Sequence, residues 1–450
     1  TFSSGSNLST LNDNVFKSCP ITKILIPASV ATISTSAFAS CVALTDVDFE
    51  GGCLLSIMDR YFGDCPIAKV KIPANVTKIT CNAFHAKTTL TDVIFEKGSK
   101  CKEIEGKYGD SMSIDYHPYY SPYNDNACGA FCLTRIESIE IPASVEIIGP
   151  NAFRATSLKN VSFDTNSKLK VLTSQGLGSR DVVYYPIGTE YIESGMKKFS
   201  SSYSEPEGAF SQCIFTDIIL PKSLEYIGPE TFACSSVISV SFEEGSLLKE
   251  IGELSFANSA ITSIAIPAKV YRIAGAAFHN CTSLFTIEFD KLSALETIEY
   301  SLYNHSPNDR AQLNGAFYGC TALTSITLPA SLTEIAKYSF YGCTALKTIK
   351  FSENATLATI GDYGFYDCPV LHTVDMSNCN QVTKIGESAF KSSDEMRLFK
   401  IGTVVPPTCG STPFGAVGNY SVLKVPDGAV TQYQSASGWK DFASITGLNE

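Results

Sequence analysis

The sequence predicts an elongated α/β solenoid with a parallel β-sheet face, about 14 coils and a small C-terminal cap. A Phe, usually after a small residue and often followed by Cys three positions later, recurs along the 450 residues, mostly at intervals of 22 to 25. An aliphatic residue stands about five positions before most of these Phe. One such unit cannot bury its apolar face alone, but stacked copies can because each layer covers the last.

Short alternating stretches between the repeat Phe predict the strands. In residues 324–328, Ile326 and Leu328 are expected to point inward. Ser325 and Thr327 are then expected to point outward. The repeat Phe themselves are Phe16, Phe38, Phe62, Phe84, Phe131, Phe153, Phe210, Phe232, Phe256, Phe278, Phe317, Phe340, Phe365 and Phe390.

The predicted strands fall into two alternating classes, so the true period is two coils. One class ends in Pro, which lacks an N–H and terminates a strand. The other ends in Phe, which is expected to add bulk to the core. The Pro class ends at Pro27, Pro73, Pro142, Pro221, Pro267 and Pro329, and the Phe class ends at Phe49, Phe95, Phe163, Phe242, Phe289 and Phe351.

Units such as "LPASLTEIAKYSFYGCTALKTI" (Leu328–Ile349) resemble the BspA-like leucine-rich repeats of bacterial surface proteins. The resemblance covers roughly residues 8–391, and the tail Val425–Gly447 is similar to the closing segment of such proteins from Bacteroides and its relatives. It implies an exported leucine-rich-repeat solenoid used for binding, often adhesion, without a conserved active site. We therefore expect a BspA-like solenoid over residues 1–391 and a capping segment over residues 392–450.

The capping segment changes character after the last repeat Phe. Residues 404–414 are rich in turn-forming residues, residues 421–426 read as a final strand, and residues 428–439 read as a short helix. Trp439 is the only Trp of the chain and is expected to seal the last coil. Such a cap is required because an open solenoid exposes an apolar layer.

Cysteines occupy the third position after eight of the repeat Phe. Ser or Thr stands there in several other copies, which indicates a small residue that forms weak hydrogen bonds. We expect buried reduced thiols, because ladder side chains run parallel and disulfide geometry needs them to face each other. Cys128 and Cys132, with Cys101 nearby, are the disulfide candidates left open. The eight are Cys19, Cys41, Cys65, Cys213, Cys281, Cys320, Cys343 and Cys368.

Composition and motifs exclude several classes of function. The formal net charge of -11 disfavours a nucleic acid partner, and no polybasic or long apolar segment predicts membrane binding or insertion. The scattered histidines predict no metal, and no nucleophile elbow, zinc motif or phosphate loop predicts catalysis or a cofactor. The chain begins at Thr1 without a leader, so we expect that an export signal has been removed. We expect a monomeric, non-enzymatic protein.

Three segments interrupt the repeat at the same point, after the aliphatic residue and before the next Phe. They span residues 105–128, 173–208 and 299–314, and together they hold eleven of the 21 tyrosines. Tyr offers a flat apolar face with a hydrogen-bonding tip, so these insertions are candidate binding loops. Packing of the loops on one another is the alternative. The candidate partner-binding residues are Tyr116, His117, Tyr119, Tyr120, Tyr123, Tyr184, Tyr185 and Tyr303.

The sequence therefore favours a non-catalytic binding protein at the cell surface or secreted from the cell. The first hypothesis is an adhesin for host or bacterial proteins. The second is a glycan-binding surface protein that uses the tyrosine-rich insertions. The third is a structural spacer that holds another domain away from the cell.

Overall fold

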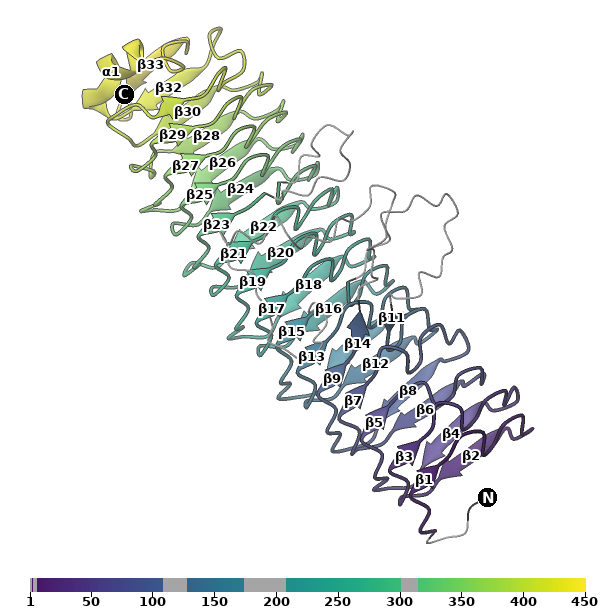
Figure 1. The fold of residues 1–450 in the computed structure, drawn as a ribbon. Coiled ribbons are helices and arrows are strands. Elements are labelled where there is room, and N and C mark those ends of the chain that lie inside the picture. The colour runs from purple at the N-terminus through teal and green to yellow at the C-terminus, as the bar shows by residue number, and fades with distance from the viewer. Residues whose placement is uncertain (1, 3–5, 108–127, 174–207, 301–314) are drawn as a thin grey trace, which may run out of the picture. The chain divides into compact units, whose positions relative to one another are not determined.

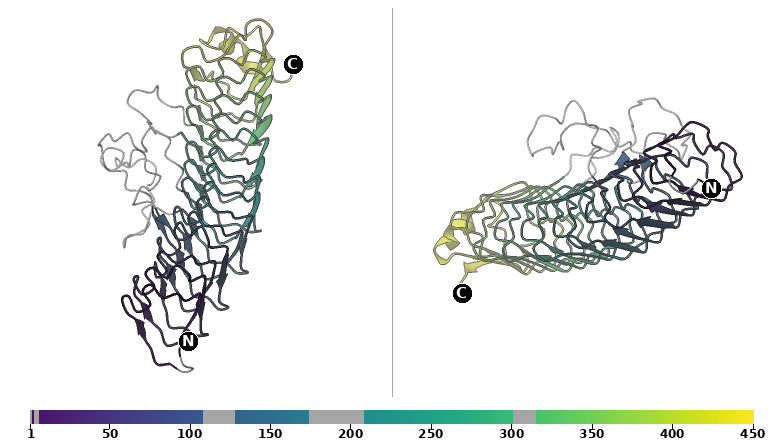
Figure 2. Two further views of the ribbon diagram at one scale, coloured as in Figure 1. Left: turned by 90° about the vertical axis from the view of Figure 1, so that its right-hand side faces the viewer. Right: turned by 90° about the horizontal axis from the view of Figure 1, so that it is seen from below.

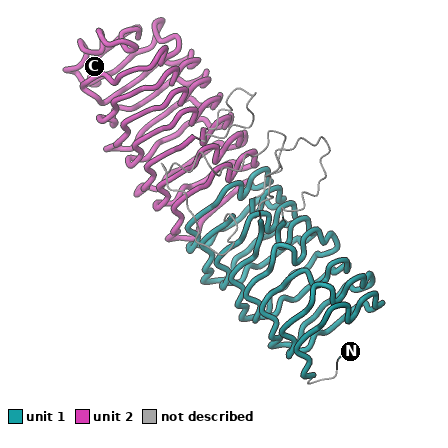
Figure 3. Tube along the Cα trace, in the orientation of Figure 1, with its two compact units in different colours: residues 1–237 teal, residues 238–450 magenta. Residues whose placement is uncertain are grey.

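The computed structural model describes residues 2, 6–107, 128–173, 208–300 and 315–450. The chain divides into two compact units, residues 1–237 and 238–450 (Figure 3). In each unit the chain winds through stacked coils, and neighbouring coils pair through parallel strands (Figures 1 and 2). The fold is the predicted leucine-rich-repeat solenoid, with about 16 turns and very little helix.

Each coil of unit 1 contributes one four-residue strand and one two-residue strand, and a turn with the repeat Phe joins the second to the first. The four-residue strands are β2 (Lys23–Ile26), β4 (Asp46–Phe49), β6 (Lys69–Ile72), β8 (Asp92–Phe95), β12 (Ser138–Ile141), β14 (Asn160–Phe163) and β16 (Asp217–Leu220). The two-residue strands are β1 (Thr10–Leu11), β3 (Thr32–Ile33), β5 (Ile57–Met58), β7 (Lys78–Ile79), β9 (Glu103–Ile104), β13 (Ile147–Ile148), β15 (Val171–Leu172) and β17 (Tyr226–Ile227). A further pair, β10 (Gly106–Lys107) and β11 (Cys128–Gly129), is antiparallel.

Unit 2 repeats the same arrangement. The only helices among the described residues lie near its C-terminal end, before the last strand. Its four-residue strands are β18 (Ser239–Phe242), β20 (Ser263–Ile266), β22 (Thr286–Phe289), β24 (Ser325–Leu328), β26 (Thr348–Phe351), β28 (Thr373–Met376), β30 (Leu398–Ile401), β32 (Val422–Val425) and β33 (Ser444–Gly447). Its two-residue strands are β19 (Glu250–Ile251), β21 (Arg272–Ile273), β23 (Thr297–Ile298), β25 (Glu334–Ile335), β27 (Thr359–Ile360), β29 (Lys384–Ile385) and β31 (Thr408–Cys409). The helices are the 3-10 turn η2 (Asp427–Ala429) and α1 (Val430–Ser435).

The inward and outward positions of the strands are as predicted. In β24, Ile326 and Leu328 are buried, whereas Ser325 and Thr327 are exposed. Ile326 pairs with Ile349 of the next coil, so apolar residues overlie one another from strand to strand. This in-register stacking of like residues is what buries the interior of each unit.

The repeat Phe form stacked rows of rings in the core of each unit. From Phe256 to Phe390 in unit 2, neighbouring ring centroids lie 4.9 to 5.2 Å apart and the rings are within 12° of parallel. In unit 1 the step from Phe131 to Phe153 is 5.3 Å. This spacing follows the roughly 4.8 Å separation of parallel strands. Full burial of each Phe stabilises its coil by about 2 to 3 kcal/mol.

Left-handed residues on both sides of the repeat Phe shape the turn. Around Phe340, Tyr338 has φ 59° and Gly342 has φ 70°. Around Phe365, Tyr363 has φ 56° and Asp367 has φ 57°. These two reversals place Phe in the core and leave the following residue at the surface corner of the coil.

Seven of the eight cysteines after the repeat Phe are buried thiols, as expected, and Cys19 is half-buried. Cys213 Sγ donates to the carbonyl oxygen of Phe153 over 3.0 Å, and Cys343 Sγ donates to that of Phe317 over 3.3 Å. Cys281 and Phe256 repeat this contact at 3.0 Å. The weak hydrogen-bonding role explains why Ser and Thr replace Cys in other coils.

The strands that end in Phe are less uniform than predicted. Phe49 and Phe351 are buried, as expected for core residues. Phe95, Phe163, Phe242 and Phe289 are only half-buried. Phe95, Phe163 and Phe289 lie on strands with no hydrogen-bonded partner on their following side within the described residues. Phe242 lies on β18, which pairs with β20, so loss of a paired neighbour is not the common cause of this exposure.

The closing segment contains the strand and the helix predicted for it. It also adds turns, since β32 and β33 extend the parallel ladder beyond β30. This raises the number of turns from the predicted 14 to about 16. Trp439 is fully buried, packs against Phe399 and Phe414, and donates its Nε1–H to the carbonyl of Pro407 over 2.9 Å.

Gaps in the ladder of four-residue strands coincide with the insertions. In unit 1, β2, β4, β6 and β8 form one ladder and β12 and β14 another, on either side of insertion 105–128. In unit 2, β22 and β24 are not paired, and insertion 299–314 lies between them. The two-residue strands remain paired there, β9 with β13 and β23 with β25. At these two insertions, therefore, pairing is interrupted between the four-residue strands and kept between the two-residue strands.

Candidate binding surface

The predicted partner-binding residues lie outside the described residues. This holds for Tyr116, His117, Tyr119, Tyr120, Tyr123, Tyr184, Tyr185 and Tyr303. Their role as a binding site stays a prediction. The structure does describe the points at which the three insertions leave and rejoin the coils, and these points show how the insertions are attached.

All three insertions leave directly after a two-residue strand and rejoin the coil at the same short motif. The motif is Gly-Ala-Phe, at residues 129–131, 208–210 and 315–317. At the first insertion, Gly106 of β10 pairs with Gly129 of β11. At the third, Tyr300 forms an antiparallel bridge with Gly315. In each of these two insertions, backbone pairing therefore joins the residue where the chain leaves the coil to the residue where it returns.

The glycine of this motif is required by close contact with the next coil. A Cβ atom on Gly208 would lie 1.9 Å from the carbonyl oxygen of Glu230. A Cβ atom on Gly315 would lie 1.9 Å from the carbonyl oxygen of Tyr338. Glu230 and Tyr338 are both left-handed residues, so the turn that positions Phe also brings this carbonyl against the glycine. The recurrence of Gly-Ala-Phe in the sequence is the signal that marks these attachment points.

The exposed face of the four-residue strands is mainly polar and bears ion pairs between coils. Lys71 lies 3.4 Å from Glu96 in unit 1, and Lys400 lies 3.0 Å from Asp375 in unit 2. Burial alone would raise the pKa of Asp375, but hydrogen bonds from Ser377 and Lys400 outweigh it and hold the pKa below its usual value. The outward residues of these strands include no aromatic side chain in the described coils. This face offers charge complementarity and, in unit 1, the single exposed aliphatic residues Leu25, Ile94 and Ile219.

A small cleft opens where β22 and β24 are unpaired. Its volume is about 370 Å³, and polar residues such as Glu288, Asp290, Ser325 and Thr327 line it beside Phe289. The cleft has the size of a small-molecule site, yet its lining lacks the apolar and aromatic majority that such sites usually have. The cleft is therefore a poor candidate for a partner-binding site.

Five tyrosines of unit 2 form a contiguous surface that we call the tyrosine strip: Tyr318, Tyr338, Tyr341, Tyr363 and Tyr366. The first row consists of the residues that follow three successive repeat Phe, with ring centroids 5.1 Å apart from Tyr318 to Tyr341 and 4.9 Å apart from Tyr341 to Tyr366. The second row pairs Tyr338 with Tyr363 at 5.2 Å. All five are partly exposed.

The two rows pack edge to face and present ring edges outward. Tyr338 meets Tyr341 at 6.2 Å, and Tyr363 meets Tyr366 at 5.5 Å, with interplanar angles of 63° and 60°. His279 stacks on Tyr318 at 4.9 Å and continues the first row by one coil. The faces of Tyr318 and Tyr341 are therefore covered on both sides by neighbouring rings. What these two residues offer a partner is their ring edges and hydroxyl groups.

The strip is an array of neutral hydrogen-bonding groups in acidic surroundings. Burial raises the pKa of Tyr341, and the neighbouring Tyr318, Tyr366 and Asp367 raise it further. Burial likewise raises the pKa of Tyr363, whose hydroxyl donates to Glu387 Oε1 over 3.3 Å. At neutral pH the phenols remain protonated and can donate hydrogen bonds.

The strip begins where the third insertion is attached. The Lys337 ammonium lies 5.2 Å from the centroid of the ring of Tyr300, the last described residue before the gap 301–314. Gly315, the first described residue after the gap, packs on the backbone of Tyr338. The strip therefore begins beside the two attachment points of the third insertion.

A pattern visible in the sequence could have identified the strip. Phe317-Tyr318, Phe340-Tyr341 and Phe365-Tyr366 repeat the same dipeptide in three successive units. The predicted partner-binding tyrosines all lie in the insertions, so this pattern was not part of that prediction. Within the described ranges, no group of His, Cys, Asp and Glu is arranged to hold a metal ion, and no helix is long and apolar enough to cross a membrane.

The repeat units define the class of protein: a leucine-rich-repeat solenoid, a fold that generally binds proteins and typically has no catalytic site. The family model of the BspA type leucine-rich repeat region matches residues 5–116, 127–202, 204–309 and 313–427. The chain therefore belongs to the BspA-type leucine-rich repeat family. No curated protein sequence matches the chain.

Several solved structures resemble the chain. A leucine-rich repeat protein from Bacteroides ovatus has a TM-score of 0.55 and 18% sequence identity, with 98% of this chain and 88% of that chain covered. The pneumococcal vaccine antigen PcpA has a TM-score of 0.41 and 20% identity, with 85% of this chain and 79% of that chain covered. The Bacteroides ovatus structure supports the solenoid fold, and at this identity it says nothing about the partner.

Proposed function

We propose that this protein is a cell-surface or secreted adhesin without catalytic activity that binds a protein partner through the tyrosine strip. Membership of the BspA-type family supports a protein-binding role at the surface. The tyrosine strip is the observation that carries the choice of site. Tyr is enriched at protein interfaces because one side chain supplies apolar area and a hydrogen bond at low entropic cost.

The geometry of the strip favours a protein over a glycan. A sugar ring that stacks on Tyr needs an open ring face, and the faces of Tyr318 and Tyr341 are covered by rings about 5 Å away. A protein can instead meet the ring edges with apolar side chains and accept hydrogen bonds from the hydroxyls. The acidic residues around the strip favour a partner with basic groups at the rim of the contact.

Binding to a panel of purified extracellular-matrix proteins tests this proposal. We expect saturable binding to at least one of them, and we expect Tyr341→Ala combined with Tyr366→Ala to weaken it at least tenfold. Tyr420→Ala is the matched control, because Tyr420 is exposed in the same unit, outside the strip. Unchanged affinity of the double variant would reject the strip as the site.

The predicted insertion site is the second candidate for the same function. Tyr119→Ala combined with Tyr120→Ala would abolish binding if the first insertion makes the contact, and would leave it unchanged if the strip does. A glycan array that shows specific binding sensitive to this pair would instead support the glycan-binding alternative. Absence of any protein or glycan ligand for the intact chain would contradict adhesion and leave the spacer function.

A further inference from the structure

Two buried cysteines of unit 1 occupy the same position of neighbouring coils. Cys81 follows β7, and Cys128 is the first residue of β11, where it pairs with Lys107 of β10. Each stands three residues before a repeat Phe, and the rings of these two, Phe84 and Phe131, stack with centroids 5.4 Å apart. Both cysteines are buried, with exposed fractions of 4% and 8%. The ladder cysteines differ, since Cys65, for example, donates to the carbonyl of Phe38 rather than to another sulfur.

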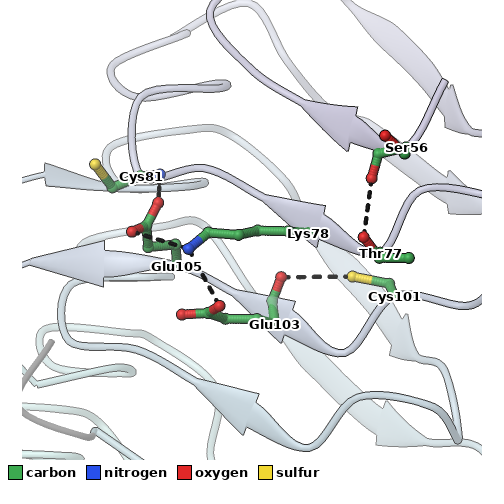
Figure 4. A network of polar contacts seen from close by, with 7 residues as sticks. All are labelled: Ser56, Thr77, Lys78, Cys81, Cys101, Glu103 and Glu105. Carbon is green, nitrogen blue, oxygen red and sulfur yellow. Dashed lines mark hydrogen bonds and ion pairs between the residues drawn. The ribbon is translucent and has the colours of Figure 1, made fainter. Parts of the chain in front are cut away.

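A polar network holds Cys81 in this position (Figure 4). The backbone N–H of Cys81 donates to Glu105 Oε2 over 3.1 Å. The ammonium of Lys78 lies 3.2 Å from carboxylate oxygens of both Glu105 and Glu103. The same strand end carries the antiparallel pair that positions Cys128, because the N–H of Ala130 donates to the carbonyl of Glu105 over 3.0 Å. Glu105 therefore bonds to both segments: its carboxylate accepts from the backbone of Cys81, and its carbonyl accepts from Ala130, two residues after Cys128.

We propose that Cys81 and Cys128 form a disulfide bond when the protein meets a low-molecular-weight disulfide oxidant such as oxidised glutathione. A cysteine thiolate attacks the oxidant and releases one glutathione thiolate. The other cysteine thiolate attacks this mixed disulfide and releases the second. Two protein thiols are oxidised, the oxidant is reduced to two glutathione thiols, and these take up the two protons lost by the protein.

The surroundings make Cys81 the first nucleophile. The hydrogen bond from the Cys128 thiol lowers the pKa of Cys81, and the same bond raises the pKa of Cys128. Burial and the charges of Glu105 and Asp59 oppose this lowering of the Cys81 pKa and the charge of Lys107 assists it, so the pKa stays below its ordinary value. A thiolate, rather than a thiol, carries out the exchange.

The disulfide would fasten the C-terminal end of the first insertion to the preceding coil. Cys128 is the first described residue after the gap 108–127. The bond would add a covalent link to the backbone pairing of Gly106 with Gly129. Cys128 was one of the disulfide candidates from the sequence, and its partner in this proposal was not among them. Cys101, another candidate, donates its Sγ–H to the carbonyl of Glu103 over 3.5 Å. In the structure, none of the 16 cysteines, all of which it describes, is in a disulfide.

Thiol counting and peptide mapping of the full chain test the proposal. The folded protein is equilibrated in reduced and oxidised glutathione, alkylated and digested. We expect free thiols to fall from 16 to 14 with one cross-linked peptide pair containing residues 81 and 128. Cys81→Ser and Cys128→Ser should each stop this loss. Cys343→Ser should not, because its thiol contacts a backbone carbonyl.

Retention of all thiols by the folded chain, or linkage of Cys128 to Cys132 or Cys101, would overturn the proposal. The oxidised protein should also unfold at a temperature higher by about 5 °C or more than the reduced protein, and Cys81→Ser should remove this difference. An oxidising exterior agrees with the proposed exported location, but the chemistry is tested in vitro. Failure of the bond to form would therefore leave the adhesin proposal untouched.

Discussion

The two units place the same Phe in the core and different residues directly after it. In unit 1 the residues after Phe84 and Phe153 are His85 and Arg154. In unit 2 the residues after Phe317, Phe340 and Phe365 are all Tyr, and their rings stack. The core position is Phe in both units, whereas the next position lies at the surface corner and varies. Identity in the core keeps the same layer packing in both units, and the three tyrosines at the corner are what set unit 2 apart as the proposed binding surface.

The largest expected effect comes from breaking what the units share. Phe153→Ala in unit 1 and Phe340→Ala in unit 2 each remove a fully buried ring from a stack. Each should lower the free energy of unfolding by about 3 to 5 kcal/mol. Chemical denaturation of both variants measures this loss. A loss below about 1 kcal/mol in either unit would show that its Phe stack is not the core.

The next effect concerns the insertion attachment points, which both units also share. Gly208→Ala and Gly315→Ala would each place a Cβ atom against a carbonyl oxygen of the next coil. We expect the free energy of unfolding to fall by about 2 to 3 kcal/mol. Gly428→Ala is the control, because a Cβ atom there meets no atom within 4 Å. Equal stability of all three variants in denaturant titration would contradict the close packing.

A smaller effect should separate the units. Tyr341→Ala loses stacking contacts worth about 1 kcal/mol, and the binding affinity should fall about tenfold, or 1.4 kcal/mol. Arg154→Ala, at the equivalent corner of unit 1, should leave the affinity unchanged. Titration of the partner against both variants measures the difference. Equal losses would mean that the corner of unit 2 has no special role.

The smallest effect is a pH dependence that belongs to unit 1. Burial lowers the pKa of His85 below its ordinary value of 6.5, and the charges of Arg154 and Arg60 lower it further. The unfolded chain therefore takes up this proton first as the pH falls. Stability from neutral His85 is present above pH 6.5 and is lost as the pH falls from 6.5 through the folded pKa. His85→Gln should reduce the slope of unfolding free energy between pH 7.5 and 5.5, and an unchanged slope would reject the assignment.

Much of the scaffold could be predicted because its residues obey a short period. Ile326, Leu328 and Phe340 were assigned to the core from spacing alone, and the structure buries all three. The role of the third position after Phe followed from its replacement by Ser and Thr. The half-exposure of Phe95, Phe163, Phe242 and Phe289 could not be predicted, since these residues hold the same position in the repeat as the buried Phe49 and Phe351.

The candidate site was less predictable than the scaffold. The Phe-Tyr dipeptides were visible in the sequence, but whether a tyrosine of a turn faces the core or the surface depends on the left-handed residues around it. Tyr338 and Tyr363 are themselves such residues, and bulky side chains rarely adopt this conformation. Their pairing with the other row could be read only from coordinates.

The amino-acid sequence by itself determined the repeat, the inward positions and the stacked Phe, because burial of a periodic apolar pattern permits one arrangement. The tertiary structure alone decided which distant residues meet at the surface. Cys81 lies beside Cys128, and Tyr318 to Tyr366 form one strip, because the coil geometry brings together positions that local spacing leaves separate. Packing of the core follows from the repeat that all coils share, whereas these surface features depend on residues that only some coils carry.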